Sequence, residues 1–419
     1  MKTKLIFIIV ALSFMSCIGD LDVTNKSAVS SKSMWKEEGD AKAAMYGLYN
    51  QFRSTFSYGY FTWGEYRTGL WGDGLTGQTS RDQVYQNQIP TNHYFSDWTE
   101  LYTTINDANL IIKKVPIIHF NSENTKNEVL SNAYFVRAFC YYWIGRIWGD
   151  APLLLEGYES DSQEGLYPQR TSAERIFEQI GNDIDKAYKL IPDGIVKNRA
   201  SKASIAMLKA DYDLWMYKVR KSGDNYLQDA NEKIQSVLAN PAYGLENNYA
   251  DIFNDQPNKE VIFEWTFVQG EFTSSETENY LVPSQYVTTK YINNPIQTGS
   301  HQQWCFFTPS FKSFLTAIQA DQRSKMTFST FYDPDKEQTF QWINKFKGHW
   351  INNTRVFDSN ILVYRYADAV LFDAEIKLAK NNIQGAINAL NQIANRAYGI
   401  DNFYSNLTTF EDVKKAIVN

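Results

Sequence analysis

The sequence has little cysteine and little histidine. Its 419 residues contain three cysteines and four histidines, and one of the cysteines, Cys17, ends an N-terminal apolar run. Cys140 and Cys305 alone are too few for a disulfide framework. The histidines lie far apart and show no His-x-x-x-His or Cys-x-x-Cys spacing, so we expect neither a metal site nor another cofactor.

Long apolar runs and clusters of basic residues are also missing. Beyond the first twenty residues no stretch has the roughly 20 apolar residues that a membrane-spanning helix needs. The net charge is −6 and the lysines and arginines are scattered, so we expect no nucleic-acid partner.

Recognisable catalytic motifs are scarce too. The Gly-x-Ser-x-Gly nucleophile motif is absent. "GDGLTG", residues 72–77, has the glycine spacing of a dinucleotide-binding loop, but it lacks the buried strand before it and the apolar helix after it, which favours a polar, flexible loop. The 47 Asp and Glu residues leave a pair of hydrolytic carboxylates possible by chance. We expect no enzymatic activity and keep a surface glycoside hydrolase as an alternative.

The N-terminus predicts an exported protein. Lys2 and Lys4 precede an apolar run that is too short to span a bilayer and that stops at Ser16 and Cys17. This pattern fits a bacterial lipoprotein signal, in which residues 1–16 are removed and Cys17 carries the lipid, such as palmitate. Ordinary signal-peptidase cleavage without a lipid is the alternative.

A polar leader follows, and we assign it to residues 17–36. Asp20 and Asp22 resemble the acidic surface-export signal of lipoproteins in Bacteroidetes-type bacteria. Residues 37–419 are then expected to form a single domain.

Apolar residues recur at helical spacing along most of this domain. Stripes are present near 41–49 and 101–112, and the segment 131–148 is apolar on most sides, so it should be sandwiched between neighbours. Further helices are expected at 172–190, 202–221, 226–239, 364–380 and 383–398.

These helices are expected to form pairs. The last pair, 366–399, has the 34-residue period of a tetratricopeptide (TPR) unit, and regularly placed alanines would let its helices approach closely. We predict a mainly α fold in which three or four TPR-like pairs stack into a right-handed superhelix with long decorated loops and a few short strands.

Two insertions without helical periodicity, about 56–97 and 244–363, interrupt the pairs, and the second contains a strand-like segment at 260–267. Loops of this length usually have a function. The first combines aromatic rings with Gly, Thr, Gln and Asn, which suits sugar recognition through ring stacking and neutral hydrogen bonds. A loop packed on its own aromatics is the alternative. We predict five ligand-binding residues, with Trp71 foremost: Trp71, Trp63, Tyr66, Tyr85 and Trp304.

Several blocks of the sequence occur in the order typical of one family. "NAYFVRAFCYYWIGRIWGDAPLL" has an Arg-Ala-Phe, aromatic-rich, Gly-Asp-x-Pro-Leu signature, and the other three blocks are "DWTELYTTINDANLII", "RASKASIAMLKADYDLW" and "YRYADAVLFDAEI" with "ALNQIANRA". Together with the lipoprotein start they resemble SusD/RagB-type outer-membrane lipoproteins over nearly the whole chain.

The resemblance implies a lipid-anchored protein at the bacterial outer membrane. It would sit on a SusC-like TonB-dependent transporter, capture glycans without cleaving them and pass them on for import. The family's binding aromatics lie in variable loops, so none of our five positions follows from the resemblance. Arg137, Asp150 and Asp368 match family motifs, and we interpret them as buried or capping charges that fix helix ends.

The chain departs from the family at its C-terminal end. "TTFEDVKKAIVN" predicts a helix capped by Thr408 and Glu411 that stops after about two turns, where relatives continue, so we expect the C-terminus to be shortened and this helix to be marginal unless it docks. Two further alternatives are a RagB-like protein that binds peptides and a generic TPR scaffold, although the latter would leave both insertions without a role.

Overall fold

The computed structural model describes residues 34–253, 258–271, 273 and 276–418. The signal segment, Cys17 and most of the polar leader lie outside these residues. Within the described part, helices dominate and the strands are short, so the mainly α prediction is confirmed. None of the described helices is both long and apolar enough to cross a membrane.

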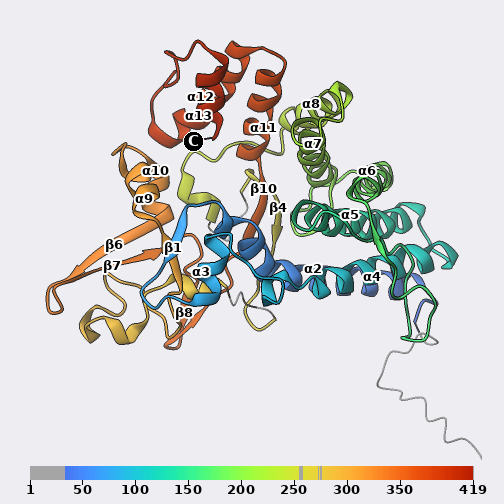
Figure 1. Ribbon diagram of the computed structural model, residues 1–419, viewed down its shortest axis with the longest axis horizontal. Coiled ribbons are helices and arrows are strands. Elements are labelled where there is room, and N and C mark those ends of the chain that lie inside the picture. Colours follow the sequence, from blue (N-terminus) through green and yellow to red (C-terminus); the bar gives the residue numbers. More distant parts are fainter. Residues whose placement is uncertain (1–33, 254–257, 272, 274–275, 419) are drawn as a thin grey trace, which may run out of the picture.

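The predicted helices are present, and they contact one another in pairs along the chain (Figure 1). The pairs are α2 Glu38–Trp63 with α4 Thr99–Lys114, α5 Glu123–Ile147 with α6 Ala173–Leu190, α7 Lys202–Lys218 with α8 Asp224–Leu238, and α11 Tyr366–Ala379 with α12 Ile383–Tyr398. The last pair occupies the segment with the TPR period. We call these eight helices the helical scaffold.

Helix α5 is the centre of the scaffold core. It packs against α2, α4 and α6, and fourteen of its 25 residues are buried, as the apolar pattern on most of its sides predicted. Gly145 lets the ring of Phe177 on α6 approach closely, because a Cβ at this position would lie 3.2 Å from that ring.

The first insertion is shorter than predicted. Residues 56–63 form the last two turns of α2, and a short helix, α3 Thr79–Tyr85, lies inside the insertion. The segment "FSYGYFTW" hides its helical period because its aromatic and small residues are buried on several faces. Gly59 is required within this turn, since a Cβ there would lie 2.3 Å from the ring of Trp63.

The remaining elements belong mainly to the two insertions, and the expected strand at 260–267 is confirmed as β4. Two short helices are α9 Pro309–Thr316 and α10 Gln322–Thr327. The strands form antiparallel two-stranded ribbons: β1 Trp71–Asp73 with β5 Cys305–Phe307, β2 Ala151–Pro152 with β3 Arg170–Thr171, β4 Val261–Trp265 with β10 Ile361–Arg365, β6 Phe328–Asp333 with β7 Gln338–Ile343, and β8 His349–Ile351 with β9 Thr354–Val356.

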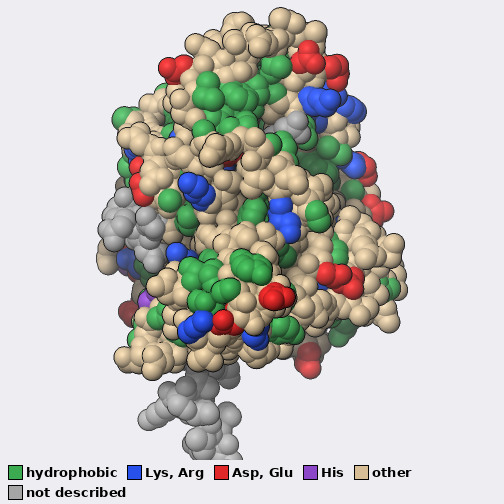
Figure 2. Space-filling view, turned by 90° about the vertical axis from the view of Figure 1, so that its left-hand side faces the viewer, with side chains coloured by type: hydrophobic (Ala, Val, Ile, Leu, Met, Phe, Trp, Pro, Cys, Tyr) green, Lys and Arg blue, Asp and Glu red, His purple; other side chains and the backbone are tan. Residues whose placement is uncertain are grey.

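The molecule thus has two sides. The pairs from α2 to α8 lie on the right of Figure 1, and β1, β5 to β9, α9 and α10, together with α3, lie on the left; we call this left side the loop-and-strand half. The ribbon β4–β10 lies between them and leads directly into α11. Figure 2 faces the loop-and-strand half and shows hydrophobic side chains in separate patches, with basic and acidic side chains dispersed among them.

Candidate functional site

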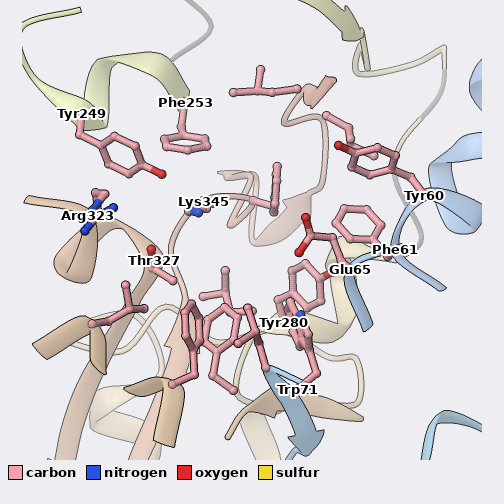
Figure 3. A pocket seen from close by; sticks show the side chains of 18 of the residues that line it. Tyr60, Phe61, Glu65, Trp71, Tyr249, Phe253, Tyr280, Arg323, Thr327 and Lys345 are labelled. Carbon is pink, nitrogen blue, oxygen red and sulfur yellow. The ribbon is translucent and has the colours of Figure 1, made fainter. Parts of the chain in front are cut away.

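A cavity of about 440 Å³ lies where the helical scaffold meets the loop-and-strand half (Figure 3). Its walls come from the end of α2, from β1, α9 and α10, from the loop after β7, and from the start of α11. Ten of the lining side chains are aromatic: Tyr60, Phe61, Trp71, Tyr249, Phe253, Tyr280, Phe307, Phe311, Phe314 and Phe346. We call this space the aromatic cavity.

Trp71 is the central ring of one wall. The antiparallel register of β1 and β5 places it opposite Phe307, and the two ring centroids lie 4.5 Å apart. Tyr66 meets it edge-on at 4.9 Å and Tyr280 lies at 5.7 Å. Trp71 is therefore only 7% exposed, and the exposed part of this wall is Phe314 on α9, which is 47% exposed.

The opposite wall carries charges, and most of them are paired. Arg323 bonds Asp321 at 2.8 Å, Arg365 bonds Asp368 at 2.8 Å, and Arg396 bonds Glu260 at 2.8 Å just behind the lining. Such pairs orient the arginines and satisfy charges that burial would otherwise penalise.

Tyr249 lies among these cations. It is only 5% exposed, and its ring centroid is 5.1 Å from the guanidinium carbon of Arg396 and 5.8 Å from Nζ of Lys345. Burial alone would raise the pKa of its hydroxyl, but Lys345, Arg365 and Arg396 together lower that pKa below its ordinary value. Negative charge is thus favoured at this end of the cavity.

Glu65, at the other end, has the opposite environment. Its carboxylate remains accessible from the cavity although protein atoms surround it, and this loss of bulk water raises its pKa against the effect of Lys345 and Arg365. Among the described residues, no ion pair holds it.

A buried polar network supports the aromatic wall from behind. Arg81 is fully buried and forms an ion pair of 2.8 Å with buried Glu276, which also accepts a hydrogen bond from the hydroxyl of Tyr66. Burial raises the pKa of Glu276, while Arg81 and Tyr66 favour its charged form. The rings of Tyr58 and Trp304 lie 4.7 and 5.1 Å from the guanidinium carbon of Arg81. The network fixes Tyr66 and hence the ring against which Trp71 rests.

Of the five predicted ligand-binding residues, Trp71 lines the cavity and the other four lie outside its lining. Tyr66 is fully buried in the network, and Trp304 is half-buried against Arg81. Trp63 belongs to α2 and donates its indole N–H to the carbonyl of Phe95 at 2.8 Å. The hydroxyl of Tyr85 contacts the carboxylates of both Asp73 and Asp82 and can donate its one proton to either of them.

The "GDGLTG" segment is tied to the second insertion. The backbone N–H groups of Gly74 and Thr76 donate to the carbonyls of Trp304 and Gln303 at 3.0 and 3.1 Å. A Cβ at Gly74 would lie 2.3 Å from the carbonyl oxygen of Gln303, so this glycine permits a close backbone approach. The segment thus positions β1 and Trp71.

Most residues of the charged wall were not predicted from the sequence. Tyr249, Arg323 and Lys345 come from the second insertion, within which Trp304 was the only predicted ligand-binding residue. Their separation of almost a hundred residues gives no periodic signal, and only the fold brings them together. Among the described residues, no group of three His, Cys, Asp or Glu side chains could hold a metal ion.

Comparison with known proteins agrees with the fold and the motifs. A family model of SusD-like proteins, described as starch-binding and associating with the outer membrane, matches residues 28–210. The SusD-like protein P38 of Formosa agariphila is 26% identical over 408 residues, which cover 90% of this chain and 78% of that protein. The SusD-like protein P2 of the same organism is 26% identical over 435 residues, covering 94% of this chain and 81% of that protein.

Solved structures show the same fold. B. fragilis NanU superposes with a TM-score of 0.80 at 23% identity, covering 94% of this chain and 88% of that one. A SusD superfamily protein from Bacteroides fragilis gives a TM-score of 0.79 at 24% identity, covering 92% and 84% of the two chains. The sequence matches and the motif order support membership of the SusD/RagB-like family, whose model is described as associating with the outer membrane, and the solved structures show that the fold is the same.

Proposed function

We propose that this protein is a non-catalytic, surface-exposed lipoprotein that binds an oligo- or polysaccharide in the aromatic cavity and delivers it to a SusC-like TonB-dependent transporter. The observation that carries the proposal is the cavity itself, with ten aromatic side chains and several hydrogen-bonding groups around about 440 Å³. Aromatic rings stack on the C–H faces of sugar rings, and hydroxyl and charged groups bond the sugar hydroxyls.

The carboxylates of the cavity favour binding over hydrolysis. Two acids line it, Glu65 and Asp368, and Asp368 is held by Arg365. Glycoside hydrolysis needs one carboxyl group that donates a proton and a second carboxylate that reaches the sugar or a water, on either side of the scissile bond. Glu65 alone does not supply this pair.

Binding can be tested by native affinity electrophoresis of residues 18–419 in gels that contain plant, host and microbial polysaccharides. We expect one class of glycan to retard the band. Phe314→Ala removes the exposed ring of the wall and should weaken binding about tenfold, the order of one stacking contact. Tyr46→Ala removes an aromatic ring that is 60% exposed on α2 and outside the cavity lining, so it should bind as the parent does.

Trp71→Ala is the more severe variant, because Trp71 also supports Tyr66, Tyr280 and Phe307. It should lose both binding and some stability. If no glycan retards the band of the folded parent, the proposal of glycan binding is wrong and the peptide-binding alternative is favoured. If both Phe314→Ala and Trp71→Ala bind as the parent does, the ligand lies elsewhere.

The anchor and the transporter belong to the same proposal. Cys17→Ala should release the protein from the membrane fraction and abolish labelling with a palmitate analogue. Retention in the membrane with unchanged labelling would contradict the anchor. Co-purification of the Cys17 protein with a TonB-dependent barrel from solubilised outer membranes is the corresponding test of the transporter.

A further inference from the structure

Lys345 is the distinctive charge of the aromatic cavity. It lies in the loop after β7, is half-buried and lines the cavity beside Tyr249 and Phe253 (Figure 3). Its Nζ atom lies 5.8 Å from the ring centroid of Tyr249 and 5.5 Å from that of Phe253. Among the described residues, no carboxylate lies within 4.0 Å of this nitrogen.

The neighbouring cations differ from Lys345 in this respect. Arg323, Arg365 and Arg396 each hold a carboxylate of the protein at 2.8 Å. A half-buried ammonium group without such a partner loses hydration and gains no ion pair in return. Among the described residues, the fold thus gives Lys345 the hydroxyl of Tyr249 as a neighbour but no carboxylate, which leaves its charge available to an anionic ligand.

The surroundings of Lys345 favour an anion. The lowered pKa of the Tyr249 hydroxyl reports a positive potential at this end of the cavity, produced by Lys345, Arg365 and Arg396 against the effect of burial. Glu65 interacts with Lys345 only at longer range, because among the described residues the two side chains form no ion pair within 4.0 Å. The aromatic rings beside Lys345 would contact the body of a sugar whose anionic group reaches the ammonium.

We propose that the aromatic cavity takes an anionic glycan, with the carboxylate or sulfate group of one sugar residue on the ammonium of Lys345 and the hydroxyl of Tyr249 beside it. This inference depends on the proposed glycan binding and adds that the bound glycan is negatively charged. A lysine is a compact point charge with three donors and pairs with either group, so the experiment must separate carboxylate from sulfate.

The test uses matched pairs of glycans that differ in charge: polygalacturonate against fully methyl-esterified polygalacturonate, and carrageenan against chemically desulfated carrageenan. Binding of the folded chain, residues 18–419, is measured by affinity electrophoresis and calorimetry. We expect the parent to bind the charged member of one pair at least tenfold more tightly than the neutral member. Because salt screens charge interactions, this preference should be smaller at ~0.5 M than at ~0.05 M NaCl.

Two variants show whether the preference for the charged glycan comes from Lys345 in the aromatic cavity. Lys345→Met keeps an unbranched apolar side chain, removes the ammonium group with its charge and should abolish the preference for the charged member. Lys336→Met makes the same change in the exposed turn between β6 and β7 and should keep it. Equal or better binding of the neutral members by the parent would overturn the inference and leave glycan binding standing. A preference retained in Lys345→Met would overturn it too, and a folded parent that binds no glycan would remove both proposals.

Discussion

Two charged residues of the family motifs, Arg137 and Asp150, make contacts that hold helices in place. Arg137 on α5 bonds both carboxylate oxygens of Asp183 on α6, at 2.7 and 2.8 Å, and the side chain of Asn109 on α4 at 2.7 Å. Asp150 accepts the backbone N–H of Ala173 at the start of α6. Asp150 thus caps the start of α6, as predicted, whereas Arg137 is a buried charge that joins the middles of α5 and α6 to α4.

The Arg137–Asp183 pair predicts a large single-mutant effect. Asp183→Ala leaves the guanidinium buried and without its counter-charge, which should lower the free energy of unfolding by about 3–5 kcal/mol. Adding Arg137→Met should restore a substantial part of this loss, because the orphaned charge is then absent. Urea denaturation at pH 7 measures both. A single-mutant loss below about 1 kcal/mol would show that the pair is not desolvated in solution.

Asp107 on α4 predicts a pH effect of defined sign. Burial raises the pKa of its carboxyl to about 6, so the folded protein holds this proton more tightly than the unfolded chain does. Its contribution to stability is complete below the unfolded pKa of about 4 and is lost as the pH rises through about 6. Asp107→Asn should therefore match the parent near pH 4 and be about 1–2 kcal/mol more stable at pH 8. Asp193→Asn, at an exposed position, is the control in urea denaturation at both pH values. A difference that does not change with pH would contradict the assignment.

At the scale of elements, periodicity predicted the scaffold and failed elsewhere for physical reasons. The helix expected at 383–398 is α12 with the same bounds, because its buried residues recur at helical spacing and Asn382 and Gly399 cap its two ends. The end of α2 was missed because Gly59 and its aromatic neighbours are buried on several faces. Trp71 was recognisable from its aromatic, glycine-rich surroundings. Lys345 was not, since its role depends on rings and charges that only the fold brings close.

The short helix α13 Phe410–Val418 packs on the rest of the protein through one fully buried residue, Val413. Its cap differs from the prediction, because the hydroxyl of Thr409, and not that of Thr408, accepts the N–H of Asp412. The helix docks on α11 and α12, and Val413 is fully buried among their apolar residues. About two turns of isolated helix are marginal in water, so this contact should hold α13 in place.

Val413→Asp should therefore detach α13 alone. We expect amides 414–418 to lose their hydrogen-exchange protection while those in the middle of α5 keep theirs. Lys414→Asp introduces an aspartate at the next residue, which is exposed, and should leave the hydrogen-exchange protection of α13 largely intact. If Val413→Asp unfolds the whole chain in one step, α13 is part of the global cooperative unit; if it changes nothing, the docking contact contributes little.

At the scale of the molecule, the aromatic cavity connects two differently built sides. The helical scaffold contributes Tyr60 and Phe61 from α2, and the loop-and-strand half contributes Trp71, Phe307 and Phe314. A ligand that touches both sides binds the folded state only when they are correctly joined. The free energy of ligand binding then stabilises each side and also the contact between the two sides.

This coupling predicts a single thermal transition that shifts as a whole with ligand. At a free glycan concentration of 100 times Kd, the folded state should gain about 2.7 kcal/mol, which for a domain of this size raises Tm by a few degrees. At the same glycan concentration the Tm of Phe314→Ala should rise less than that of the parent, because the variant has a higher Kd for the glycan. The Tm of Tyr46→Ala should rise as much as that of the parent. Calorimetry measures the transition, and hydrogen exchange of β10 and β5 shows whether both sides gain protection. Two separate transitions, of which the glycan moves only one, would mean that the ligand binds one side alone and that the cavity between them is not its site.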